Sequence, residues 1–288
     1  MGAEAAAQSK SFAFVESLAA DLSGGALELP SFPEIVIRIR KALEDDNCTT
    51  AKLAQLIGSE PALAARLLQI ANSAAVRRGP DPVSDVNTAI GLLGWDIVRS
   101  SAMSFAMKQI RDGQKLKAAQ PYLEVVWNDG VNVAALCHVL AKKYTKLSAD
   151  EAMLVGLLHG IGKLYILAQA EKHPELFEDE QSLYALLDEW HPGIGKAILE
   201  SMEFDDEIAA AVGDYLDLSR QHEGDVDFTD LLMMANIVSG LLGDSDGFEV
   251  QLDDIPASRY FTSSVEEFFT ILTESAEHIS SLRHALGT

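Results

Sequence analysis

Apolar residues recur along most of the chain at intervals of three and four, which places them on one face of an α-helix. Leu63, Leu67 and Ile70 follow this spacing, and residues 12–19 form an amphipathic stretch near the amino terminus. No convincing stretch alternates apolar and polar residues as a half-buried strand would. The pattern predicts an all-α protein of about a dozen helices.

Residues that favour the first and last turns of helices mark the boundaries in the amino-terminal part. Thr49 or Thr50 opens a helix that Gly58 closes. Ser59, with Pro61 in the first turn, is expected to open the next helix.

Similar signals continue further along the chain. Gly94 separates a short helix from a longer one. Ser148 and Glu151 form the S-x-x-E pattern of a capping box, which fixes the start of another helix. Two successive helices are then predicted, in residues 182–190 and 191–202.

The predicted helices fall into two lobes with a segment at either end. Residues 1–26 form an amino-terminal helix or tail, and residues 27–120 form the first helical lobe. Residues 121–240 form the second lobe, and residues 241–288 form a carboxy-terminal helical extension.

The charge balance argues against nucleic acid as a partner. The chain has 22 basic and 44 acidic residues, a formal net charge of −22, which repels DNA, RNA and anionic membranes. A helix–turn–helix rhythm in residues 53–74 is therefore read as core rather than as a DNA-binding motif.

The location expected from the sequence is the cytoplasm. The two cysteines are far apart, and the start of the chain lacks the features of a secretory signal. No run approaches the roughly 18–20 apolar residues that a membrane span requires.

The sequence GLLHGIGKL, which begins at Gly156, is an unusual segment for a buried helix. Each helical glycine costs roughly 1 kcal/mol relative to alanine. Gly156 and Gly160 lie four residues apart, so their shared face can admit a second helix. His159 and Lys163 beside it could bind an anion or a metal. Alternatively, His159 is a buried residue bonded to a backbone carbonyl, and the glycines serve helix packing.

Four motifs, in this order, resemble those of the HDOD family, the HD-related output domains of bacterial signalling. They are SEPALAARLLQIANSA at 59–74, VNTAIGLLGWDIVR at 86–99, VGLLHGIGKL at 155–164 and HPGIGKAIL at 191–199. The resemblance covers residues 27–240. It implies an all-helical, two-lobed fold with an HD-like second lobe, and a regulatory rather than catalytic role.

HD phosphohydrolases hold a divalent metal through a first histidine, a His-Asp pair and a later aspartate. By resemblance, Asp129 stands at the first position, and His159 is followed by Gly160 in place of the paired aspartate. Asn236 replaces the final aspartate. Two carboxylates are lost, so too little negative charge remains to hold a dication. The resemblance therefore implies no metal, no cofactor and no catalytic residue.

Other residues complete the expected vestigial pocket. His191 matches a further histidine of the family pattern, and Asp214 lies where paired histidines often stand. An alternative is that Lys163, His159 and His191 line a pocket able to hold a small anion or nucleotide. The remaining histidines are scattered, and His222 is expected at the surface.

These observations predict a non-catalytic output module that acts through protein–protein contact. The resemblance implies partners among sensor kinases, receiver proteins and proteins that make or degrade cyclic di-GMP. The strongly negative chain should favour a partner with a basic face. The competing hypotheses are a metal-dependent HD phosphohydrolase and a small-nucleotide sensor.

Overall fold

Every regular element in the described part of the chain is a helix. The structure is a computed structural model that describes residues 14, 18, 34–45, 47–73, 82–113, 117–170, 172–243, 252–261, 265–274 and 276–286. The prediction of an all-α fold is confirmed. The predicted amino-terminal helix lies mostly outside the described residues; Phe14 and Leu18 are helical and buried.

The helices form two groups that α6 and α14 connect. The first group comprises α2 (Glu34–Leu43), α3 (Thr50–Gly58), α4 (Pro61–Ala71), α5 (Val86–Leu93) and α6 (Trp95–Gly113). The second comprises α7 (Gln120–Tyr144), α8 (Ala149–Leu158), α9 (Ile161–Ala170), η1 (Pro174–Phe177), α10 (Glu180–Ser201), α11 (Asp206–Asp214) and α12 (Phe228–Gly243). The carboxy-terminal elements are η2 (Leu252–Asp254), η3 (Pro256–Tyr260), α13 (Val265–Glu274) and α14 (Ala276–Leu286).

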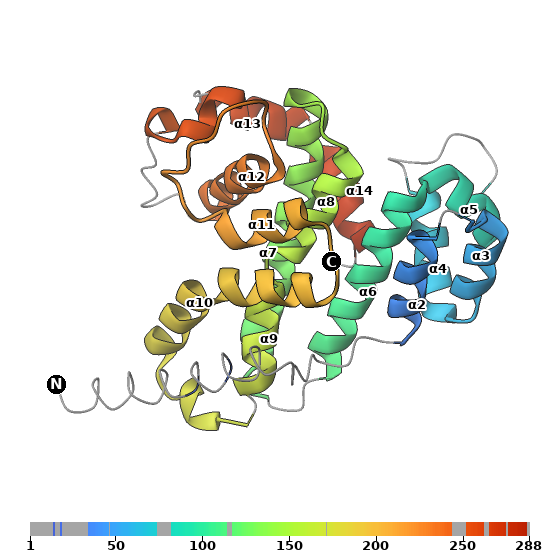
Figure 1. The fold of residues 1–288 in the computed structure, drawn as a ribbon, viewed down its shortest axis with the longest axis horizontal. Coiled ribbons are helices and arrows are strands. Elements are labelled where there is room, and N and C mark those ends of the chain that lie inside the picture. The colour runs from blue at the N-terminus through green and yellow to red at the C-terminus, as the bar shows by residue number, and fades with distance from the viewer. Residues whose placement is uncertain are drawn as a thin grey trace.

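Figure 1 shows α2–α5 at one end of the molecule, with α6 between them and the second group. The long helix α7 packs most extensively against α8. The carboxy-terminal helix α14 lies along α7 and also reaches α4. The extension therefore contacts both groups of helices.

Most of the helix boundaries follow the local sequence signals. The Thr49 side chain accepts a hydrogen bond in the first turn of α3, as its type predicts. Gly94 ends α5 with a φ of 81°, a conformation that favours glycine. The expected role of Ser59 was wrong: its hydroxyl donates to the Leu56 carbonyl at the end of α3, and Glu60 precedes α4.

The two helices predicted for residues 182–190 and 191–202 form one continuous helix, α10. Pro192 lies inside it, although proline lacks the N–H that would bond the carbonyl four residues earlier. Burial of the apolar face of α10 outweighs this loss. The proline therefore does not mark a helix end here.

The glycine-rich segment joins α8 to α9 through a turn at His159 and Gly160. Gly156 and Gly160 both face α7, which confirms the prediction of a close helix approach. A Cβ atom on Gly156 would lie 2.6 Å from Ala134 Cα, and one on Gly160 would lie 3.2 Å from Val126 Cγ1. The contact at Gly156 is the more restrictive, because it involves backbone atoms.

Gly162 serves a different neighbour from the other two glycines. A Cβ atom here would lie 2.9 Å from the Gly195 nitrogen and closer still to the His191 carbonyl oxygen, both on α10. The three glycines thus bring two helices, α7 and α10, against the α8–α9 pair. This close packing positions the side chains of the candidate site.

The expectation that no run reaches membrane-spanning length was wrong for residues 149–170. This stretch, α8 and α9, has a mean hydropathy of 1.4 and is long enough to cross a bilayer. However, 83% of its apolar window is buried within the fold. Such burial is typical of a core helix.

Candidate functional site

The candidate site lies where α7, α9 and α10 meet the α8–α9 turn. Asp129 comes from α7, His159 from the end of α8, Lys163 from α9 and His191 from α10. A fifth residue, Tyr215, follows α11 and was not predicted. The structure therefore gathers four of the seven predicted pocket positions, together with one new side chain.

His159 is buried and contacts oxygen acceptors through both ring nitrogens. Its Nδ1 lies 2.6 Å from the Gly156 carbonyl oxygen, and its Nε2 lies 3.3 Å from Asp129 Oδ2. Burial tends to raise the pKa of Asp129, but the hydrogen bond and the charges of His159 and Lys163 hold that pKa below its usual value. The carboxylate is therefore ionised and paired with the imidazole.

His191 is a neutral hydrogen-bonding residue. Its Nδ1 donates to the Leu187 carbonyl at 2.7 Å, so its Nε2 accepts from the Tyr215 hydroxyl, also at 2.7 Å. Burial, and then the nearby charge of Lys163, lowers the pKa of His191 to about 3. The Tyr215 ring also contacts the edge of His159, at 5.6 Å between centroids. The two histidines are thus joined through one tyrosine.

Lys163 brings a positive charge into this group. Its Nζ lies 3.1 Å from Asp188 Oδ1, and the Lys163 side chain is 22% exposed. Its charge also lowers the pKa values of Asp129 and His191. Lys163 therefore lies partly exposed beside the two histidines, with Asp188 as its partner.

The other three predicted pocket residues do not add a side chain to this group. Gly160 packs against α7 and contributes no side chain. Asp214 is exposed at the end of α11. Asn236 lies on α12, one turn before Ser239, which lowers the pKa of Asp129 through a side-chain hydrogen bond.

These residues do not fit a divalent metal of the HD type. His159 Nε2 and Asp129 Oδ2 face each other, and His191 Nε2 is occupied by a hydroxyl donor. The Lys163 ammonium would repel a metal ion placed between these residues. A dication would have to break the existing pair, displace a buried hydrogen bond and overcome this repulsion.

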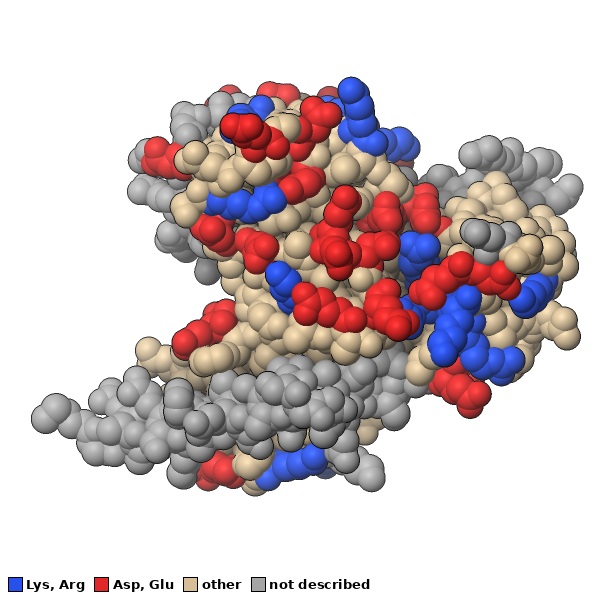
Figure 2. All heavy atoms as spheres, in the orientation of Figure 1, with Lys and Arg blue, Asp and Glu red and all other residues tan. Residues whose placement is uncertain are grey.

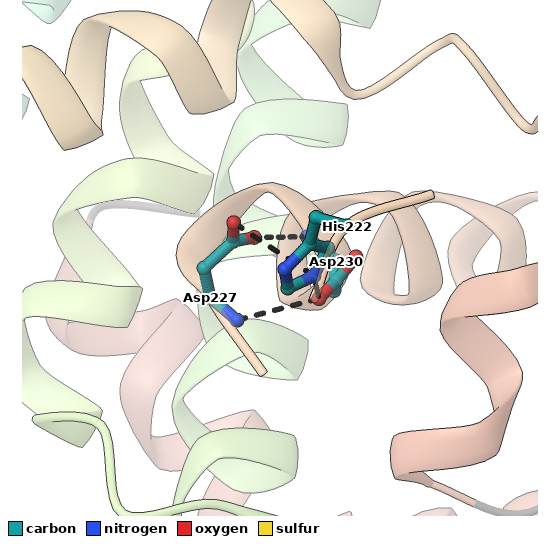
Figure 3. A group of neighbouring side chains, drawn as sticks. All are labelled: His222, Asp227 and Asp230. Carbon is teal, nitrogen blue, oxygen red and sulfur yellow. Dashed lines mark hydrogen bonds and ion pairs between the residues drawn. The ribbon is translucent and has the colours of Figure 1, made fainter. Parts of the chain in front are cut away.

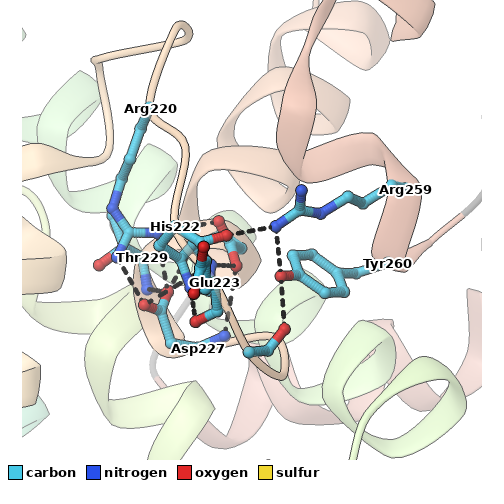
Figure 4. Close-up of polar contacts among 9 residues, drawn as sticks. Arg220, His222, Glu223, Asp227, Thr229, Arg259 and Tyr260 are labelled. Atoms are coloured by element: carbon cyan, nitrogen blue, oxygen red, sulfur yellow. Dashed lines mark hydrogen bonds and ion pairs between the residues drawn. The ribbon is translucent and has the colours of Figure 1, made fainter.

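A second polar cluster was missed at the start of α12 (Figures 3 and 4). We call it the α12 clasp, comprising Arg220, His222, Asp227 and Asp230. Asp227 Oδ1 accepts the Asp230 backbone N–H at 3.0 Å, and Asp230 Oδ2 accepts that of Asp227 at 3.3 Å. This reciprocal arrangement is a capping box with aspartate at both positions. Its D-x-x-D pattern was visible in the sequence.

The α12 clasp has the residue types of a metal site, but an arginine already supplies the cation. One ligand atom from each of His222, Asp227 and Asp230 lies within 4.8 Å of the others. Arg220 bonds Asp227 Oδ2 at 2.6 Å and the buried Asp230 at 3.0 Å. The His222 side chain is 22% exposed and donates to Asp230 Oδ2 at 2.7 Å, so it is partly buried by its partner rather than fully exposed. The clasp therefore stabilises the loop before α12.

Two residues of η3 fasten the same loop from the other side (Figure 4). Arg259 donates to the His222 carbonyl oxygen at 2.7 Å, and the Tyr260 hydroxyl donates to the Gly224 carbonyl oxygen at 2.8 Å. The loop that begins at Tyr215 is thereby connected to the carboxy-terminal extension.

Comparison with known proteins identifies the family. The HDOD domain model matches residues 29–215, well over half of the sequence. The chain therefore belongs to the HDOD domain family. A search of curated proteins finds none that matches it.

Solved structures with this fold cover nearly the whole chain. A protein of Shewanella amazonensis, described as a candidate metal-dependent phosphohydrolase, is 28% identical with a TM-score of 0.80, covering 96% of this chain and 99% of its own. An HDOD domain protein of unknown function from Geobacter sulfurreducens is 21% identical with a TM-score of 0.66, covering 94% and 96%. A candidate signal transduction protein of Marinobacter aquaeolei is 19% identical with a TM-score of 0.62, covering 96% and 66%. Because the last two structures are less than 25% identical to this chain, they show only that the fold is shared.

Proposed function

We propose that this HDOD protein is a non-catalytic signalling module that acts through contact with other proteins. The observation that carries the proposal is the composition of the candidate site. A hydrogen bond joins His159 to the Asp129 carboxylate, and the Lys163 ammonium lies beside them, so the ligand atoms that a metal would need are already paired. Without a bound dication, the site has no means of activating water for phosphoester hydrolysis.

Membership of the HDOD family supports a role in bacterial signal transduction, and the described signal transduction protein of Marinobacter aquaeolei shares the fold. The expected partners are sensor kinases, receiver proteins or proteins of cyclic di-GMP turnover, in the cytoplasm. Carboxylates spread across the visible face of the molecule (Figure 2) and favour a partner with a basic face. Binding should therefore weaken as ionic strength rises.

A nucleotide sensor is the less favoured alternative. Phosphate groups require uncompensated positive charge, but Lys163 is paired with Asp188 and lies close enough to Asp129 to lower its pKa. The Asp129 and Asp188 carboxylates would also repel a phosphate.

The test is to measure metal content and hydrolysis on the purified full-length chain after growth with manganese, iron, nickel and zinc. We expect far less than one ion per chain, and no turnover of bis(p-nitrophenyl) phosphate or cyclic di-GMP. His159→Ala and His222→Ala locate any metal that is found. One ion per chain that is lost in His159→Ala, kept in His222→Ala and required for turnover would overturn the proposal.

A further inference from the structure

Exposed apolar side chains lie on the elements that supply the candidate site. The described residues expose five large apolar side chains, and four of them lie on α7, on α10 and in the loop after α11. They are Val125 (55% exposed), Tyr184 (39%), Leu216 (42%) and Leu218 (40%), and we call them the mouth rim. The fifth, Ile37, lies on α2 in the other group of helices.

Two members of the mouth rim lie one helical turn from charged residues of the site. Val125 precedes Asp129 by four residues on α7, and Tyr184 precedes Asp188 by four residues on α10. The ring of Tyr122, on α7, lies 5.5 Å from that of Tyr184 between centroids. The two helices therefore present their apolar and acidic residues side by side.

The loop after α11 provides the other two members. Tyr215 is buried in the site, and Leu216 and Leu218 follow it in the exposed loop. The Tyr215 hydroxyl lies 2.7 Å from His191 Nε2 on α10, and the Tyr215 ring contacts His159, which bonds Asp129 on α7. The start of the loop is therefore held against both helices at the candidate site.

The exposed charges near these apolar side chains are mainly negative. Asp129 and Asp188 have side chains that are 40% and 66% exposed, and Asp214 and Asp217 in the adjoining loop are also exposed. Lys163 is 22% exposed and already paired with Asp188. An incoming segment would therefore meet apolar contacts surrounded by carboxylates.

We infer that the mouth rim is a docking surface for a protein segment that combines aliphatic or aromatic side chains with lysine or arginine. The inference rests on the proposed function and names the surface through which it operates. Apolar anchors supply most of the affinity of an interface, and charge complementarity supplies orientation and specificity. A two-fold contact between copies would bring the same carboxylates together, so a second copy is the less favourable occupant.

The test uses a random peptide library displayed on phage as the probe. The full-length chain is the bait, and the enriched peptides are afterwards tested on the double variant Leu216→Ser, Tyr184→Ser. Enriched peptides should combine aliphatic or aromatic residues with lysine or arginine. Their affinity, measured by fluorescence anisotropy, should fall roughly tenfold or more on the double variant.

Ile37→Ser is the matched control, because it removes an equally exposed apolar side chain from the other group of helices. Affinity should not change in this variant, and circular dichroism should show that all variants remain folded. Peptides that bind the double variant equally well, or that lack basic residues, would overturn the inference. A dimer of the natural chain that the double variant dissociates would also overturn it. None of these outcomes alters the metal and hydrolysis measurements, so the two proposals can fail separately.

Discussion

Replacing Gly156 with alanine should destabilise the protein by forcing apart its most extensively packed helix pair. The new Cβ atom would lie 2.6 Å from Ala134 Cα and 2.8 Å from its nitrogen, whereas ordinary contacts begin near 3.4 Å. Helices α7 and α8 would have to separate by about 0.8 Å, because backbone atoms cannot rotate away. Overpacking of this kind costs roughly 1–3 kcal/mol. Backbone contact favours the upper end of this range.

Alanine also has an intrinsic advantage over glycine in a helix, of roughly 1 kcal/mol. The net destabilisation expected for Gly156→Ala is therefore about 2 kcal/mol. Gly91→Ala is the matched control, since Gly91 lies inside α5 with nothing within 4 Å of the added atom. That variant should gain up to about 1 kcal/mol. The free energies of unfolding of the two variants should thus differ by about 3 kcal/mol.

The assay is urea unfolding at 25 °C, followed by far-ultraviolet circular dichroism, on the natural chain and both variants. The slopes of the transitions should match, so that the midpoints report stability. If Gly156→Ala is as stable as Gly91→Ala, the reasoning about close packing between α7 and α8 is wrong.

Two further predictions concern charged groups. The pKa of His191 is about 3 in the folded protein and near 6.5 in the unfolded chain. The neutral histidine therefore contributes to the free energy of unfolding above pH 6.5. This contribution is lost as the pH falls, by up to about 1.4 kcal/mol per pH unit. Between pH 7 and pH 5, the urea midpoint of His191→Gln should change less with pH than that of the natural chain. An equal change in the two proteins would contradict the assignment of His191 as neutral. Arg220→Met should cost about 2–3 kcal/mol, because the buried Asp230 loses its cation, whereas Arg259→Met at an exposed site should cost less than about 1 kcal/mol. Equal losses in thermal unfolding would show that the clasp contributes no special stability.

Local sequence signals predicted much of the helical framework. Thr49 and Gly94 mark helix ends because capping and positive φ depend only on neighbouring residues. The predicted break between residues 190 and 191 was wrong, because tertiary burial of α10 outweighs the single backbone hydrogen bond lost at Pro192. Ser59 was expected to begin α4 but ends α3 instead, and Glu60, the next residue, precedes α4.

The site was less predictable, since its contacts join residues far apart in the sequence. The pairing of Asp129 with His159 spans 30 residues, although the family pattern placed both in one pocket. Tyr215 has no local feature that reveals its hydroxyl as the partner of His191. The role of His222 likewise depends on the folding of a charged loop back onto α12.

The α12 clasp has a practical consequence for defining the unit that folds. The family match ends at Tyr215, within the hydrogen-bonded site, whereas Arg259 and Tyr260 hold the following loop from outside the matched segment. A fragment that ends with the family match would have Tyr215 as its last residue, without the loop and the η3 residues that hold this part of the chain in place. We expect the unit that folds to include η3, so expression boundaries should be chosen beyond it.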